Sequence, residues 1–204
     1  NGRQRRRRFR NNYVTYKEGI YMGYRYWETR GFDEGTEKWT AAAEDTDHAN
    51  YLHGTETKEW NNWYEGHVVY PFGYGLSYTA FQYGDLNVKK LGETDYYVSF
   101  SVKNVGRHVA SEIVQVYIAD DASMVTRPRK ELVAFGKKRL EVGETCTFGF
   151  NLTERDFAYF SPVLNEFYVE NGTFTILIGA SSADIRLQEK VEIKLPDEKQ
   201  FSQY

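Results

Sequence analysis

The chain has 204 residues, of which 41% are hydrophobic and 17% aromatic, and Tyr (17) outnumbers Phe (13). This composition indicates a globular protein with enough length for one or two packed domains, and it excludes a wholly disordered chain. The formal net charge of −3 provides no field that would attract nucleic acid or a membrane surface, and one cysteine excludes an internal disulfide framework.

Residues 1–12 form an arginine-rich tail. Such a run is typical of a nucleic-acid arm, a targeting tract or a processing site, and also of a solvated tail or junction outside the fold. The second interpretation is favoured, because the rest of the chain is not basic enough to complete a nucleic-acid footprint. No apolar run follows the tail as in a signal peptide or approaches the ~18 residues of a membrane span, so the cytoplasm is favoured over secretion.

Residues 13–67 are rich in aromatic side chains but have poor periodicity. The portion Glu18–Trp27 leans towards a strand rather than a short helix, and Gly19 and Gly23 are interpreted as allowing close packing. An alanine-rich stretch predicts a helix from Lys38 to Leu52.

Three tryptophans in this segment are candidates for a substrate rim, because an indole ring can stack on a sugar. Packing against neighbouring parts of the chain is the favoured alternative. The three candidates are Trp39, Trp60 and Trp63.

Residues 68–83 are expected to form an ordered linker that leads into a β-domain. Pro71 fixes one backbone dihedral, and Gly73 and Gly75 permit positive φ or a close backbone approach. The surrounding aromatic side chains are expected to fill the seam between two packed bodies.

From residue 84 onwards, short alternating segments separated by turns predict a mainly β, two-sheet antiparallel sandwich, and no helix is required after residue 82. In the segment 110–119, Ile113, Gln115 and Tyr117 are expected on the face opposite Val114, Val116 and Ile118. The predicted strands are 85–90, 96–103, 110–119, 131–138, 144–152, 173–180 and 185–193.

The loop Arg127–Lys130 has two interpretations. Its cations can contact an acidic partner surface, or the loop is solvated and Pro128 keeps a sheet edge from pairing.

Several of these segments resemble glycoside hydrolase family 3, the β-glucosidase and β-xylosidase family. The resemblance covers roughly residues 16–30 and 68–190, and it implies the end of an α/β sandwich domain followed by a fibronectin type III-like (immunoglobulin-like) domain. The segments that carry it, in order, are Glu18–Trp27, Pro71–Thr79, Val102–Gly106, Glu112–Ile118, Arg127–Leu132, Phe135–Lys138, Glu154–Ala158 and Gly172–Ser182.

The resemblance also divides the chain into regions. After the basic tail or junction at 1–12, it implies the end of the α/β sandwich domain with a Trp-rich insertion at 13–67 and the ordered linker at 68–83. The fibronectin type III-like domain is expected at 84–195 and a short tail at 196–204.

The chemistry implied by the resemblance is retaining glycoside hydrolysis, which needs a carboxylate nucleophile and a carboxyl acid/base roughly 5–5.5 Å apart. Neither catalytic carboxylate can be assigned in this sequence, because the family's aspartate and glutamate belong to regions outside the resemblance. The acidic patch Glu44–Asp47 is interpreted as a solvated face. No catalytic residue, cofactor or metal site is therefore predicted.

The histidines and the cysteine also give no pattern of a metal site or of a cysteine nucleophile. His48 and His53 are five residues apart and do not share one helical face, and His67 and His108 have no neighbouring ligands in the sequence. Cys146 lies in a strand pattern and is expected to be a small buried apolar residue.

The resemblance implies a non-catalytic accessory portion of a β-glucosidase-like enzyme. Its expected partners are the remaining catalytic domains and a β-glucoside or oligosaccharide substrate, without nucleic acid or membrane. The alternative is a free-standing carbohydrate-binding or adhesion module. Glu18–Trp27 discriminates between the two, since a free-standing module has no reason to carry the end of another domain.

Overall fold

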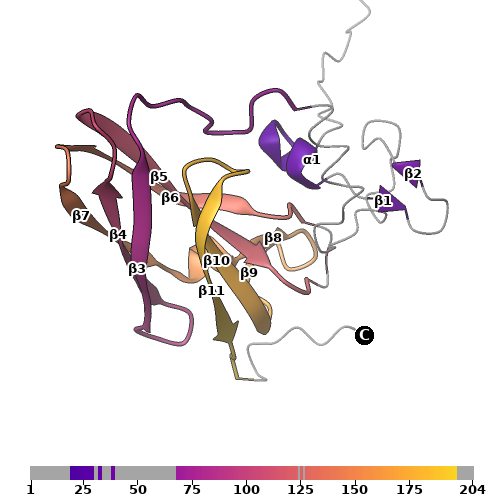
Figure 1. Ribbon diagram of the computed structural model, residues 1–204. Coiled ribbons are helices and arrows are strands. Elements are labelled where there is room, and N and C mark those ends of the chain that lie inside the picture. Colours follow the sequence, from indigo (N-terminus) through magenta and orange to yellow (C-terminus); the bar gives the residue numbers. More distant parts are fainter. Residues whose placement is uncertain are drawn as a thin grey trace, which may run out of the picture.

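The computed structural model (Figure 1) describes residues 19–29, 32–33, 38–39, 68–123, 125 and 127–196, with the backbone alone at 32–33 and 38–39. Within these ranges, most of the chain is antiparallel β-structure. No helix in this described part is long and apolar enough to cross a membrane.

Two antiparallel sheets form the sandwich. The three-stranded sheet has the order β3-β4-β7, with β3 at Phe81–Lys90, β4 at Tyr96–Asn104 and β7 at Thr145–Leu152. The four-stranded sheet has the order β11-β10-β5-β6, with β11 at Ile185–Ile193, β10 at Gly172–Gly179, β5 at Ala110–Asp120 and β6 at Glu131–Leu140.

The core lies between the two sheets and is built by alternation along the strands, which places every second side chain on the same face. Phe100 on β4, Val116 on β5 and Ile176 on β10 are three of these core side chains, and each is at most 1% exposed. Burying such side chains stabilises the fold by roughly 1.5–3 kcal/mol each. Phe100 also stacks on Phe148 and Phe150 of the neighbouring strand β7, with ring centroids 5.7 and 6.1 Å apart.

The seven predicted strands and the sandwich are confirmed, with small differences at the ends. The largest difference is in β3, which begins at Phe81 instead of residue 85. Its register shifts between Gly84 and Asn87, and Asp85 has a φ of 54°. This irregularity breaks the alternation that the sequence prediction relied on.

Three short elements after residue 152 were missed. The helix α3 at Glu154–Phe157 contradicts the expectation of no helix after residue 82, and β8 at Tyr159–Ser161 pairs with β9 at Glu166–Tyr168. Each is three or four residues long, too short for a periodic pattern to show. The start of α3 is tied by the Thr153 backbone N–H, which donates to the Asp156 carboxylate at 2.7 Å.

The N-terminal predictions need two corrections. Tyr24–Thr29 is the helix α1, so the lean towards a strand in Glu18–Trp27 was wrong for its last residues. Gly19 and Gly23 have φ of 55° and 59° and open space where a Cβ would lie, so left-handed backbone, not close packing, explains them.

The predicted helix Lys38–Leu52 is also wrong at its start. Lys38–Trp39 is the strand β2, and it pairs with β1 at Phe32–Asp33. The other residues of that predicted helix, together with the tails at 1–12 and 197–204, lie outside the described residues.

Candidate docking site

The outer face of the four-stranded sheet is covered where α1 and the linker meet β5. Gln115 and Tyr117 alternate with the core residues of β5, so they lie on the outer face, yet they are only 4% and 0% exposed. Ile113, on the same face, is 44% exposed, because it lies beyond this cover. Figure 1 shows α1 beside one end of the sandwich and the linker running from it across to β3.

We call the contact of α1 (Tyr24–Thr29) and the linker with the outer face of β5 the joint. Aromatic rings form one part of it. Tyr24 of α1 stacks on Phe72 of the linker with a centroid distance of 4.4 Å and an interplanar angle of 19°. On its other side, Tyr24 meets Tyr117 edge-on at 6.4 Å. The Tyr117 hydroxyl donates to Gln115 Oε1, and burial raises the pKa of this phenol, with smaller contributions from Tyr24 and Glu28.

A buried ion pair fixes the end of α1. The Lys130 Nζ lies 3.0 Å from Glu28 Oε2, and the Ser182 hydroxyl donates to Glu28 Oε1 at 2.5 Å. Glu28 and Lys130 are 1% and 4% exposed. A buried charge that loses its partner destabilises a protein by roughly 3–5 kcal/mol, so removing either Glu28 or Lys130 alone is expected to be unfavourable.

The backbone around the start of β6 is also held by α1. Arg129 N–H donates to the Thr29 hydroxyl at 2.9 Å, and Leu132 N–H donates to the Tyr24 hydroxyl at 2.9 Å. Two backbone donors, one in the loop and one in β6, are thus satisfied by side chains of α1. The helix thus forms part of the wall of the sandwich.

Arg127 makes a second buried charge cluster beneath the joint. Its guanidinium contacts Asp120 and Glu131 at 3.3 Å each and donates to the Phe157 carbonyl at 3.2 Å. Arg25 of α1 reaches Glu131 at 3.0 Å. The solvated-loop interpretation was therefore wrong for Arg127 and Lys130, since these two cations are buried and bind carboxylates of this same chain.

The linker is anchored at Gly73. Gln115 Nε2 donates to the carbonyls of Gly73 at 3.3 Å and Ala180 at 2.9 Å, and Ser182 N–H donates to the Phe72 carbonyl at 2.9 Å. Gly73 has a φ of 76°, and a Cβ there would lie 2.2 Å from Gln115 Nε2. Both the backbone conformation and the close approach require glycine.

Replacing Gly73 by alanine is expected to loosen this anchor. The left-handed conformation alone disfavours alanine by about 1–2 kcal/mol, and Gln115 must also move. Hydrogen exchange of the Ser182 amide, which donates to Phe72, should become faster in Gly73→Ala. Gly75→Ala is the matched control, because a Cβ at Gly75 meets no atom within 4 Å. Equal exchange in the two variants would contradict the anchor.

The far end of the linker is held by Asn104, which is fully buried at the end of β4. Its Oδ1 accepts from the Thr79 hydroxyl at 2.7 Å and from Gly106 N–H at 3.1 Å. Its Nδ2 donates to the carbonyls of His108 at 2.8 Å and Leu140 at 3.1 Å. One amide thus joins the linker, the turn after β4 and the end of β6.

The predicted rim residues are not brought together in the described part of the chain. Trp39 lies on β2, of which only the backbone is described, and Trp60 and Trp63 lie outside the described residues, as do Glu44–Asp47. The rim stays a prediction. Among residues 19–29, 68–123, 125 and 127–196, no group of three or more His, Cys, Asp or Glu side chains could hold a metal ion. Cys146 is half-buried against the core instead of fully buried.

A carboxyl with a shifted pKa lies at another edge of the sandwich. Burial raises the pKa of Glu112, although the hydrogen bond from the Tyr83 hydroxyl at 2.8 Å and the charge of Arg186 act against the shift. Arg186 is held by the Asp184 carboxylate at 3.0 and 2.7 Å. Retaining hydrolysis needs two carboxyl groups facing one sugar, whereas each carboxyl here is paired with a resident donor.

The raised pKa of Glu112 predicts a pH-dependent stability. A carboxyl whose pKa is higher in the folded state favours folding below its ordinary value of 4.5, and this contribution is lost as pH rises through the folded-state pKa. Glu112→Gln removes the titration, so its stability relative to the wild type should increase as pH rises above 4.5. Urea unfolding between pH 4 and 8 measures this difference, and a difference that is constant across pH would contradict the shift.

Comparisons with known proteins agree with this fold. Residues 112–182 match the model of the fibronectin type III-like domain. The thermostable β-glucosidase B of Acetivibrio thermocellus is 39% identical over 183 residues, which are 88% of this chain and 20% of that protein. An exo-α-(1→6)-L-arabinopyranosidase of Bifidobacterium longum is 35% identical over 85% of this chain and 18% of its own length.

A solved structure gives the same result. The crystal structure of a GH3 β-glucosidase from Bifidobacterium adolescentis aligns with a TM-score of 0.67 and 35% identity, covering 86% of this chain and 21% of that one. The chain thus spans about a fifth of the length of the relatives it matches.

The sandwich is therefore a fibronectin type III-like domain, as predicted. Most of the chain matches the region of family 3 β-glucosidases that carries this domain towards the C-terminus, and the predicted resemblance is confirmed.

Proposed function

We propose that this chain is the non-catalytic bracing portion of a family 3 glycoside hydrolase that removes terminal β-linked glucose with retention. The buried Glu28–Lys130 pair at the α1 joint carries the proposal. It locks the segment before the linker onto the β-sandwich, which is what a brace between two domains requires. We also propose the region boundaries given above.

The contacts of α1 support this role over a free-standing module. The helix contributes Tyr24, Glu28 and Thr29 to hydrogen bonds, a ring stack and a buried ion pair with the sandwich. A module that acts alone would be expected to present the outer face of its sheet, which here is occupied by α1. The joint instead holds an element of the preceding region in one orientation.

Catalysis is assigned to carboxylates outside this chain. The proposed substrate class is that of the relatives named as β-glucosidases, among them the thermostable β-glucosidase B at 39% identity. Relatives named as exo-α-(1→6)-L-arabinopyranosidases, at 35%, and as a putative β-xylosidase, at 40% over 58% of this chain, match as well. Terminal β-glucosides are therefore the proposed substrates of the whole enzyme, and the remaining domains are the proposed partners.

The test compares the 204-residue chain with the complete gene product that carries it, using an aryl β-glucoside. The complete product is expected to hydrolyse the substrate, and the chain alone is expected to be inactive. Hydrolysis by the chain alone, abolished by one Asp or Glu substitution within it, would overturn the proposal. A complete gene product without hydrolase activity would overturn it as well.

A carbohydrate-binding module is the second candidate, and one observation favours it. Tyr70 and Tyr78 of the linker are 72% and 95% exposed, and exposed aromatic rings can stack on sugars. Titration of the chain with cello-oligosaccharide decides the matter. Micromolar binding that Trp60→Ala, Tyr70→Ala or Tyr78→Ala removes would favour the module, and absence of binding would favour the brace.

A further inference from the structure

The linker exposes an apolar surface that the joint does not use. From Val68 to Gly84 the sequence has no charged residue, although 27% of the chain is charged. We call the segment Val69–Tyr78 the strap. Within it Val69, Leu76 and Tyr78 are 80%, 88% and 95% exposed. Large apolar side chains exposed along one charge-free segment favour an interaction site.

The strap is exposed but its backbone is fixed. Gln115 and Ser182 hold it at Gly73 and Phe72, as described above. Val105 N–H donates to the Ala80 carbonyl at 2.9 Å just beyond its end. A surface that is ordered before binding loses little conformational entropy when it docks, which favours tight association.

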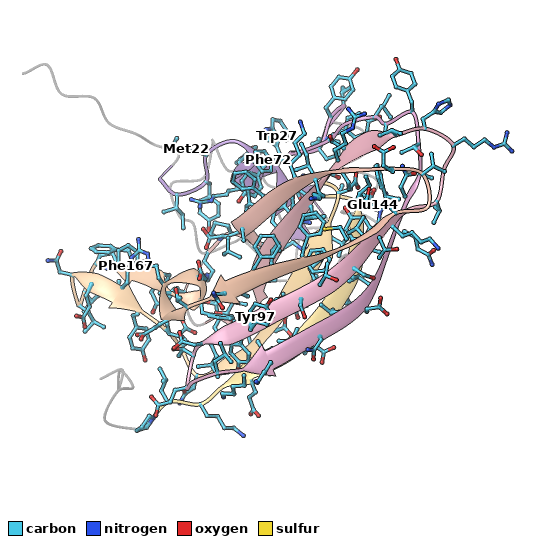
Figure 2. The ribbon with its side chains drawn as sticks, turned by 90° about the vertical axis from the view of Figure 1, so that its left-hand side faces the viewer. Met22, Trp27, Phe72, Tyr97, Glu144 and Phe167 are labelled. Carbon is cyan, nitrogen blue, oxygen red and sulfur yellow. The ribbon has the colours of Figure 1, made fainter. Side chains whose placement is uncertain are left out.

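Side chains before and within α1 extend the apolar surface. Met22 is 60% exposed and Trp27 is 39% exposed, and the stack of Tyr24 on Phe72 connects their segment to the strap. Figure 2 shows Met22, Trp27 and Phe72 along the upper side of the molecule. Depletion of charge together with abundant aromatic residues is the composition of the buried centre of a protein interface.

We propose that the strap docks onto the catalytic portion of the same polypeptide, which covers Leu76 and Tyr78. The inference rests on the proposed function and names the surface through which the brace acts. About four fifths of the length of the thermostable β-glucosidase B lies outside the matched region, since the match covers 20% of it. The strap follows the region 13–67 in the sequence and leads into the β-sandwich, so the neighbouring domains of one polypeptide lie within reach of it.

Hydroxyl-radical footprinting tests this directly, because it reports the exposure of individual side chains. It is applied to the isolated chain and to the complete gene product. Leu76 and Tyr78 should react readily in the isolated chain and about tenfold more slowly in the complete product, as their side chains pass from nearly full exposure into an interface core. Val163 and Phe135, which are 80% and 70% exposed on other parts of the sandwich, are matched controls expected to remain reactive.

A variant adds a functional readout. Leu76→Asp with Tyr78→Asp places charges in the strap and should lower the temperature at which the complete product loses aryl β-glucoside hydrolysis. Val163→Asp should leave this temperature unchanged.

The outcomes separate the inference from the function beneath it. If Leu76 and Tyr78 react as fast in an active complete product as in the isolated chain, the proposed docking surface is wrong. The proposed bracing function is then unaffected. Protection in the isolated chain that grows with its concentration would identify a second copy as the occupant and would also overturn it. Protection by cello-oligosaccharide would overturn both, in favour of the carbohydrate-binding module.

Discussion

Lys130→Leu is expected to release α1 from the β-sandwich. The substitution leaves the Glu28 carboxylate buried without its cation, and such a loss destabilises a protein by roughly 3–5 kcal/mol. Detachment of α1 relieves this loss, because the Glu28 carboxylate is then exposed to water. The destabilisation therefore cannot exceed the free energy with which α1 docks onto the sandwich. It is expected as local opening of residues 19–29 while the sandwich stays folded.

Hydrogen exchange measures this opening at individual amides. Arg129 and Leu132 donate to side chains of α1, so their amides should exchange much faster in Lys130→Leu, while the amides of β4 and β10 keep their protection. Lys194→Leu is the matched control. It breaks the Lys194–Glu192 pair at 2.9 Å, which is exposed and contributes no more than ~1 kcal/mol.

The double variant Glu28→Leu with Lys130→Leu separates the ion pair from the packing. Replacing both partners of a buried pair by apolar side chains is often neutral. The double variant is thus expected to recover most of the protection lost in Lys130→Leu. If Lys130→Leu leaves exchange at Arg129 and Leu132 unchanged, the ion pair does not hold the joint.

The sandwich could be predicted from the sequence because its signals are local. A strand with one buried face shows alternation in the sequence itself, as in Val98, Phe100 and Val102 of β4. The family segments added the domain type. Elements of three or four residues, such as α3 and β8, carry no such signal and were missed.

The joint could not be predicted in the same way, because its contacts lie far apart in the sequence. Lys130 is a polar loop residue by its neighbours, and only the fold brings Glu28 against it. Gln115 and Tyr117 alternate correctly onto the outer face, but alternation cannot show that α1 covers that face. For α1, Tyr24 and its neighbours have strand propensity as aromatic residues, and contacts with the sandwich override it.

Asn104→Ala is expected to be the most damaging polar substitution in the sandwich. It removes four hydrogen bonds at once and leaves the Thr79 hydroxyl, the Gly106 N–H and the carbonyls of His108 and Leu140 without this partner. Of these groups the Leu140 carbonyl is buried, whereas Thr79, Gly106 and His108 are partly or fully exposed and can bond to water instead. One unsatisfied buried group destabilises a protein by about 1–3 kcal/mol, and a net loss of this size is therefore expected.

Urea unfolding of the whole chain measures this loss, with Asn87→Ala as the matched control. Asn87 is on β3 and exposed, so the same substitution there should change stability little. Asn104→Asp is the discriminating variant. It keeps the acceptor for Thr79 and Gly106 but cannot donate to His108 and Leu140, and it brings a carboxylate next to two carbonyls. If the amide is needed both as donor and as acceptor, Asn104→Asp should destabilise the fold about as much as Asn104→Ala. If only its acceptor role matters, the stability of Asn104→Asp should be close to that of the wild type.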